Sequence, residues 1–91
     1  MRVIVNLESD RLAKAAGWRA KAIVLNEKKE ALLTEALKAV TLSQGSLYDF
    51  ISLQGILRNE FVLYVNGKQV KGGSGLNIPV KDNTQVHIYE R

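Results

Sequence analysis

The sequence predicts an α+β fold, in which a mixed sheet of four to five strands packs against one main helix plus an additional helix. Segments with strand periodicity occupy both ends of the 91-residue chain, and the best helix-forming segments lie between them. Towards the C-terminal end, the pair Asn66-Gly67 follows the clearest strand. An Asn-Gly pair after an apolar run is the strongest short-range signal for a β-hairpin.

The first 26 residues are predicted to form a strand, a connector and a second strand. Residues 2–8 alternate between apolar and polar side chains, which is typical of a half-buried strand. Ser9 is expected to cap a short helical turn over residues 10–16, and Gly17 is expected to end it. Residues 21–26 (KAIVLN) are an apolar, β-branched run of strand length.

Residues 27–40 contain the best helix-forming stretch of the chain. Leu33, Leu37 and Val40 are spaced so that they form one apolar stripe on such a helix. Lysine and glutamate residues supply its polar side. We therefore expect a helix here, although its last residues are also compatible with an extended conformation.

A second helix is predicted to begin after the break at Gln44-Gly45. Ser46 is the expected N-cap, and Asp49 three residues later completes a weak capping box. The apolar stripe of this helix consists of Leu47, Phe50, Ile51 and Leu57. Gly55 either costs the helix about 1 kcal/mol relative to alanine or marks its end.

Three strands are predicted in the last third of the chain. Residues 61–65 and 68–70 form the hairpin around Asn66-Gly67, and residues 85–90 form the closing strand. The glycines of residues 72–75 are expected to make a flexible loop, and Pro79 with residues 81–83 a second turn region. The resulting element order is β-β-α-α-β-β-β.

Composition places the chain among small soluble proteins. Residues 1–91 are expected to form a single domain, since this length supports only one core. The absence of cysteine excludes disulfides and thiol chemistry. No apolar run approaches the ~18 residues needed to span a membrane, and no signal peptide fits the first residues. A cytoplasmic protein that does not associate with membranes is therefore expected.

The net charge of +4 admits nucleic acid, an acidic membrane or an acidic protein as a partner. The basic residues are scattered, however, and their longest run is two lysines. This distribution favours an ordinary solvated surface over nucleic-acid binding.

No catalytic, cofactor-binding or metal-binding residues are predicted. His87 is the only histidine, and its alternation with Val86 and Ile88 indicates the less buried face of a strand. No nucleophile accompanies it, and no His/Asp/Glu cluster has metal-ligand spacing. The glycine-rich loop at residues 72–75 does not lead into a helix, as a phosphate-binding loop would. We therefore expect a protein that is not an enzyme.

Possible partner-binding residues are Trp18, Arg19, Arg58, Lys68, Lys71 and Lys81. Trp18 and Arg19 lie in a connector, where the tryptophan either covers the edge of the core or serves as an exposed anchor for a protein partner. Covering the core is favoured. The other four are candidates for a cluster near the end of the hairpin that would attract an acidic partner, although solvated turns are the default explanation.

Three segments carry a resemblance to a known family. Residues 45–51 (GSLYDFI), 62–68 (VLYVNGK) and 79–86 (PVKDNTQV) are similar, in this order and spacing, to the ubiquitin-like β-grasp family of the molybdopterin-synthase small subunit and the thiamine-pathway sulfur carrier. With the first strand, the likeness covers roughly two-thirds of the chain. It implies a sheet with the first and last strands side by side at its centre.

Two alignments with this family remain open. If Ser46 begins the family's main helix, residues from about 9 to 35 contain an additional helix or hairpin. Alternatively, the helix after Asn26 is the main one and residues 41–59 are the addition. The GSLYDFI match favours the first alignment.

Members of this family act through a C-terminal Gly-Gly, whereas this sequence ends in Tyr89-Glu90-Arg91. The resemblance therefore implies a non-enzymatic ubiquitin-like module for protein–protein interaction, without the reactive tail. One alternative is a sulfur carrier or protein modifier with an incomplete or processed C-terminus. A second is a basic nucleic-acid-binding β-grasp domain. The sequence leaves the oligomeric state open.

Overall fold

The computed structural model describes residues 1–26, 30–71 and 75–91. These residues form a five-stranded sheet, two short two-stranded sheets and three helices. The helices are α1 (Asp10–Ala16), α2 (Leu33–Lys38) and α3 (Leu47–Ile51). The strands are β1 (Arg2–Leu7), β2 (Ala20–Val24), β3 (Glu30–Leu32), β4 (Ser52–Leu53), β5 (Ile56–Leu57), β6 (Phe61–Val65), β7 (Lys68–Val70), β8 (Pro79–Lys81) and β9 (Thr84–Glu90).

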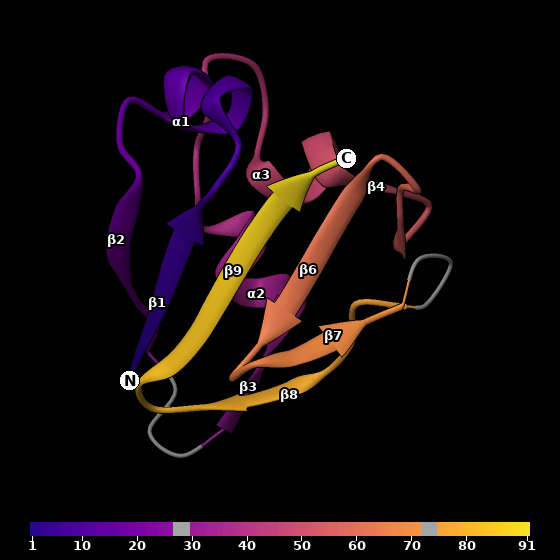
Figure 1. Ribbon diagram of the computed structural model, residues 1–91. Helices are drawn as coiled ribbons and strands as arrows, with labels where there is room; N and C mark the ends of the chain where they lie inside the picture. The colour runs from indigo at the N-terminus through magenta and orange to yellow at the C-terminus, as the bar shows by residue number, and fades with distance from the viewer. Residues whose placement is uncertain (27–29, 72–74) are drawn as a thin grey trace.

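The five-stranded sheet has the order β2-β1-β9-β6-β7. β1 and β9 are parallel neighbours at its centre, in the register from Val3↔Thr84 to Leu7↔Ile88. All other strand pairs of this sheet are antiparallel. Figure 1 shows β1 and β9 side by side, with α2 and α3 behind the sheet and α1 beyond the end of β1. The predicted α+β class and the predicted central pairing of the first and last strands are confirmed.

The core lies between this sheet and the helices behind it. Alternation along β1 buries Val3, Val5 and Leu7 on the helix side, as the period of a strand requires. The neighbouring strands add the fully buried side chains of Phe61, Leu63, Val86 and Ile88. None of the helices within the described residues is long and apolar enough to cross a membrane.

The predicted connector after β1 is confirmed in detail. The Ser9 hydroxyl accepts a hydrogen bond from the Leu12 N–H at 3.3 Å and so caps α1. Gly17 ends α1 in the left-handed conformation, with φ of 85°, which glycine adopts without a steric cost. β2 then returns antiparallel to β1.

The helix predicted over residues 27–40 is wrong at its beginning. Residues 27–29 lie outside the described residues, and Glu30–Leu32 forms β3, which pairs with β8. α2 starts only at Leu33, whose N–H donates to the Ile78 carbonyl at 2.7 Å. Pairing with a strand distant in sequence therefore outweighs the local helix propensity.

The second predicted helix is shorter than expected. It begins at the predicted cap, where the Ser46 hydroxyl accepts from the Asp49 N–H at 3.2 Å. It ends at Ile51, because the chain turns back in a small hairpin formed by β4 and β5. Gln54 and Gly55 both have positive φ, so Gly55 lies in the turn of this hairpin and Leu57 in its second strand.

The Asn66-Gly67 hairpin is confirmed, with φ of 51° and 81° at its two turn residues. Pro79, expected in a turn, instead begins β8, where the missing N–H of proline is tolerated. The following turn reaches the left-handed region at Asn83, with φ of 65°. Residues 72–74 of the predicted glycine-rich loop lie outside the described residues.

α2 is the more deeply packed of the two central helices, contrary to the favoured alignment. Four of its six residues are buried, namely Leu33, Thr34, Ala36 and Leu37. α3 buries only Leu47 and Ile51. In Figure 1, α2 lies behind β9 at the middle of the sheet, whereas α3 lies towards one end. α2 therefore corresponds to the main helix, and the segment with α3 and the β4–β5 hairpin is the addition.

This assignment predicts unequal costs of substitution. Leu37→Ala should lower the free energy of unfolding by about 2–5 kcal/mol, because it leaves a cavity under the sheet. Leu53→Ala, at a leucine that is 60% exposed on the β4–β5 hairpin, should change it by no more than about 0.5 kcal/mol. Urea denaturation of both variants measures this difference, and equal costs would contradict the packing described for these two leucines.

Candidate functional site

The five-stranded sheet has an open face, opposite the face that the helices cover (Figure 1). On this face β6 and β9 bring together residues that are distant in sequence, since Val62 pairs with Tyr89 and Tyr64 with His87. With Gly67 these four side chains line a shallow groove of about 430 Å³. We call these five residues the open-face patch.

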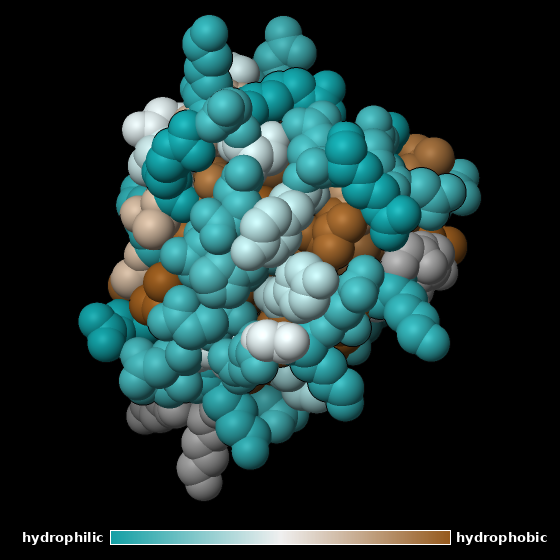
Figure 2. Space-filling model, viewed as in Figure 1, coloured by the Kyte–Doolittle hydropathy of each residue, from teal (hydrophilic) through white to brown (hydrophobic). Residues whose placement is uncertain are grey.

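Two tyrosines dominate the open-face patch. The Tyr64 and Tyr89 rings meet edge to face, with centroids 5.7 Å apart and planes at 84°. This is a favourable arrangement for two aromatic rings. Tyr89 remains 41% exposed. Figure 2, drawn from the same side as Figure 1, shows pale and brown atoms in the middle of this face among teal hydrophilic ones.

Glu8 places a carboxylate beside the open-face patch. The parallel pairing of β1 and β9 brings it there, and its N–H donates to the Ile88 carbonyl at 2.8 Å. Its Oε2 lies 3.3 Å from Nδ1 of His87, and both side chains are partly exposed. Loss of solvent contact, together with the negative charge and hydrogen bonding of Glu8, raises the pKa of Tyr89.

The open-face patch offers apolar contact and two phenol hydroxyls, and Glu8 adds a carboxylate beside it. These groups suit binding through packing and hydrogen bonds. Within residues 1–26, 30–71 and 75–91, no group of three or more His, Asp or Glu side chains is arranged to hold a metal ion. All buried side-chain nitrogen and oxygen atoms of this part of the chain have hydrogen-bond partners.

The structure places Trp18 and Arg19 between α1 and β2, away from the open-face patch. Trp18 is half-buried and packs against the core, which agrees with the favoured expectation that it covers the core edge. Lys21 Nζ lies 5.9 Å from the centre of its ring. Arg19 pairs with Asp10, and this hydrogen-bonded ion pair lowers the pKa of Asp10.

The four remaining predicted residues do not gather at one end of the hairpin. Arg58 precedes β6, whereas Lys68 follows it, so the length of the strand separates them. Lys71 follows β7, and Lys81 ends β8 in a different sheet. Arg58 is engaged internally, since its Nε donates to the Ser52 carbonyl at 3.4 Å and its Nη1 lies 4.0 Å from Glu60 Oε1.

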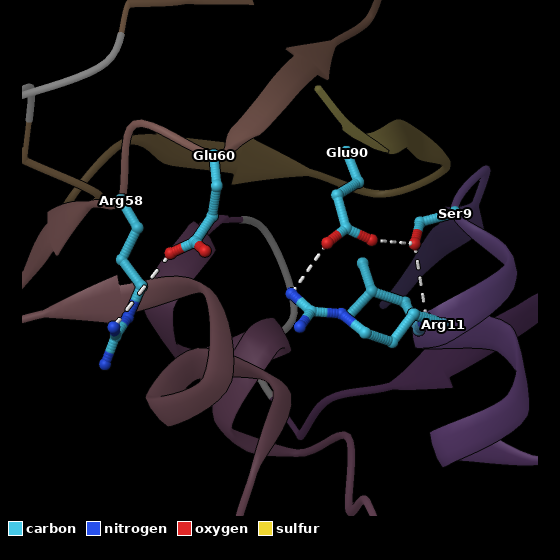
Figure 3. A network of polar contacts seen from close by, with 6 residues as sticks. Ser9, Arg11, Arg58, Glu60 and Glu90 are labelled. Carbon is cyan, nitrogen blue, oxygen red and sulfur yellow. Dashed lines mark hydrogen bonds and ion pairs between the residues drawn. The ribbon is translucent and has the colours of Figure 1, made fainter.

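Arg58 borders a polar network at the end of β9, shown in Figure 3. One carboxylate oxygen of Glu90 pairs with Arg11 at 2.7 Å, and the other accepts from the Ser9 hydroxyl at 2.7 Å. The Arg11 guanidinium also lies 5.1 Å from the centre of the Phe50 ring. These contacts fasten the last strand to α1 and give the network a structural role.

The sequence revealed only part of the open-face patch. The expectation that His87 lies on the less buried face of its strand is confirmed, because its side chain is 35% exposed. The alternation that places His87 there also places Tyr89 there. The contributions of Tyr64, Val62 and Glu8 depend on which strands are neighbours, which alternation alone does not determine.

The topology and the site define a ubiquitin-like β-grasp fold, and comparison with solved structures supports this. The crystal structure of SAMP1 from Haloferax volcanii superposes with a TM-score of 0.72 at 18% identity, covering 100% of this chain and 96% of that chain. A crystal structure of H. volcanii small archaeal modifier protein 1 gives 0.70 at 18% identity, covering 98% and 95%. No family model and no curated protein matches the sequence. The predicted resemblance is thus confirmed at the level of the fold.

The contact with Glu8 predicts a measurable effect on Tyr89. A raised pKa means that the folded protein favours the neutral phenol. The associated stabilisation is present below the unfolded-state pKa and is lost as the pH rises through the folded-state pKa. Glu8→Gln should lower the pKa of Tyr89 towards its ordinary value, because the negative charge is removed while the burial remains.

Titration of ¹³C-labelled tyrosine followed by NMR resolves the three phenols of the chain separately. Glu30, which is exposed on β3, provides the control variant Glu30→Gln. This substitution should leave the pKa of Tyr89 unchanged. An unchanged Tyr89 titration in Glu8→Gln would show that the carboxylate does not act on this phenol.

Proposed function

We propose that the chain is a non-enzymatic, cytoplasmic ubiquitin-like module that binds a protein partner through the open-face patch. The observation that carries this proposal is the pairing of Tyr64 with Tyr89 on the uncovered face of the sheet. Tyrosine is enriched in protein interfaces, since its ring supplies contact area and its hydroxyl a hydrogen bond. Held against each other, the two rings lose little conformational freedom when a partner binds.

Charges around the open-face patch support binding to a protein surface that combines apolar and charged groups. Glu8 and His87 border the tyrosines on one side, and Lys68 follows Gly67 on the other. In this proposal Lys68 is a rim charge of the open-face patch, while Lys71 after β7 and Lys81 on β8 add to the positive field that speeds encounter with an acidic surface. Arg58 and Trp18 contribute mainly to the fold, through the contacts described above.

A photo-crosslinking amino acid at position 64, introduced into the protein in its own cells, tests this function. We expect it to capture a defined protein, whereas the same group at Lys14 on α1 should not capture that protein. With the purified partner, Tyr64→Ser and Tyr89→Ser should each weaken binding by about thirtyfold or more, as interface hot spots do. Leu53→Ser, on the β4–β5 hairpin, is the matched control.

Equal losses for all three serine variants, or none for the tyrosine variants, would refute binding through the open-face patch. Circular dichroism and thermal unfolding of each variant separate a lost contact from a lost fold. Trp18→Ala tests the hypothesis that Trp18 is an exposed anchor for the partner. An unchanged affinity in a folded variant would exclude that role.

A role as a sulfur carrier or protein modifier is the alternative function, and it is favoured by the likeness of the fold to SAMP1, a small archaeal modifier protein. Its test is the intact mass of the protein purified from its own cells. A thiocarboxylate, or a Gly-Gly extension encoded after Arg91, would support this role.

Nucleic-acid binding is the remaining alternative, and the net charge of +4 is its only support. We expect no mobility shift of RNA or DNA at low salt, where phosphate contacts are strongest. A shift that weakens steeply with added salt would favour this alternative.

A further inference from the structure

β2 forms one edge of the five-stranded sheet, and its outer side pairs with no other strand of the described residues. Figure 1 shows this strand at the left margin, beside β1. A free edge exposes a row of backbone N–H and C=O groups that can pair with another extended chain. The register of β2 on β1 determines which residues supply those groups.

Hydrogen bonds to β1 fall on the odd-numbered residues of this segment. Leu25 N–H donates to the Met1 carbonyl at 2.9 Å, and the Met1 amino group donates to the Leu25 carbonyl at 3.1 Å. At the other end, Leu7 N–H donates to the Arg19 carbonyl at 2.7 Å. Since bonded and non-bonded pairs alternate in an antiparallel ladder, Ala20, Ala22 and Val24 direct their backbone groups outwards.

The side chains of this edge leave the backbone accessible. Ala20 and Ala22 are small and exposed, and Val24 is 72% exposed. Figure 2 shows tan and brown atoms along the corresponding margin. The opposite edge differs, because β7 has only three residues and begins with Lys68. Short strands and lysines are common means of blocking an edge, so β2 is the more receptive edge.

Lys21 is the cation of the β2 edge for which the described residues supply no ion-pair partner. Lys21 pairs with the buried Val5, so its side chain projects on the helix side, near Trp18. Arg19 precedes the strand but pairs with Asp10, and Arg2, which lies opposite Val24, donates to the Asn83 side chain. In a symmetric pairing of two copies around Ala22, the two Lys21 side chains would be diagonal neighbours, about 7–8 Å apart. Their repulsion disfavours a second copy and favours a segment with negative charge.

We propose that the β2 edge binds an extended acidic segment of a protein partner as an additional antiparallel strand. Backbone bonds form at Ala20, Ala22 and Val24, opposite β-branched residues of the segment, and a carboxylate of the segment lies opposite Lys21. This inference rests on the proposed function, because it also requires a protein partner. The surface that it concerns is separate from the open-face patch.

A synthetic peptide, acetyl-Val-Ile-Val-Glu-Val-Asp-amide, provides the probe. In antiparallel register its residues lie opposite residues 24 to 19, with glutamate opposite Lys21 and aspartate opposite Arg19. In a ¹H–¹⁵N NMR titration we expect the largest shifts at the amides of Ala20, Ala22 and Val24. Shifts confined to the Tyr64 and His87 region, or no shifts, would overturn the inference.

A charge exchange tests the predicted partner of Lys21. Lys21→Glu should weaken peptide binding by about tenfold or more, since it places two like charges opposite each other. The same variant should bind a peptide with lysine in place of glutamate at least as well as the original protein binds the original peptide. Lys14→Glu, with an equal charge change on α1, should leave both affinities nearly unchanged. Failure of the exchanged pair to recover binding would overturn the inference.

A backbone test is independent of charge. Ala22→Pro removes an outward N–H but none of the bonds that join β2 to β1, so the fold is retained and binding falls by about tenfold. Sedimentation of the free protein should show a monomer, and a dimer abolished by Ala22→Pro would assign the edge to a second copy instead. These outcomes do not depend on Tyr64→Ser or Tyr89→Ser, so each surface succeeds or fails separately.

Discussion

The parallel pairing of β1 with β9 is the constraint on which the rest of the structure depends. It joins the first and last strands near the centre of the sheet. Every other element lies between these two strands in the sequence, so the pairing fixes both ends of the segment that contains them. Glu8 reaches His87 because of this pairing, and β2 becomes an edge because β1 already has β9 as its other neighbour. Both candidate surfaces therefore follow from one ladder of backbone hydrogen bonds.

The sequence predicted the elements whose signals are local. Ser9 and Gly17 mark the two ends of α1, and Asn66-Gly67 marks the hairpin, because each acts through its own backbone geometry. The prediction failed at Glu30–Leu32 and after Ile51, where strands pair across the fold or in a hairpin that helical periodicity had concealed. Local propensity contains no information about such pairing.

In the candidate sites, too, features with a local sequence signal were predicted, and features that depend on strand pairing were not. Alternation along the last strand was enough to place His87 on the open face, whereas its meeting with Tyr64 requires the neighbour relation of β6 and β9. Charged residues were the least informative signal. Arg58 and Arg19 attract attention in the sequence, yet in the structure each pairs with an acidic side chain of the same chain. The alanines of β2 are inconspicuous, and their significance comes from the register.

The central pair also determines how the molecule responds to mechanical load. β1 starts at one end of the sheet and β9 finishes at the other, as Figure 1 shows. Tension between the two ends of the chain is therefore directed along both strands and shears their ladder, so that its hydrogen bonds resist together instead of opening one after another. The contacts of Glu90 with Ser9 and Arg11 reinforce the far end of that ladder. A chain pulled from both ends would therefore stay folded until this ladder ruptures, because the elements between the two strands bear no load before that point.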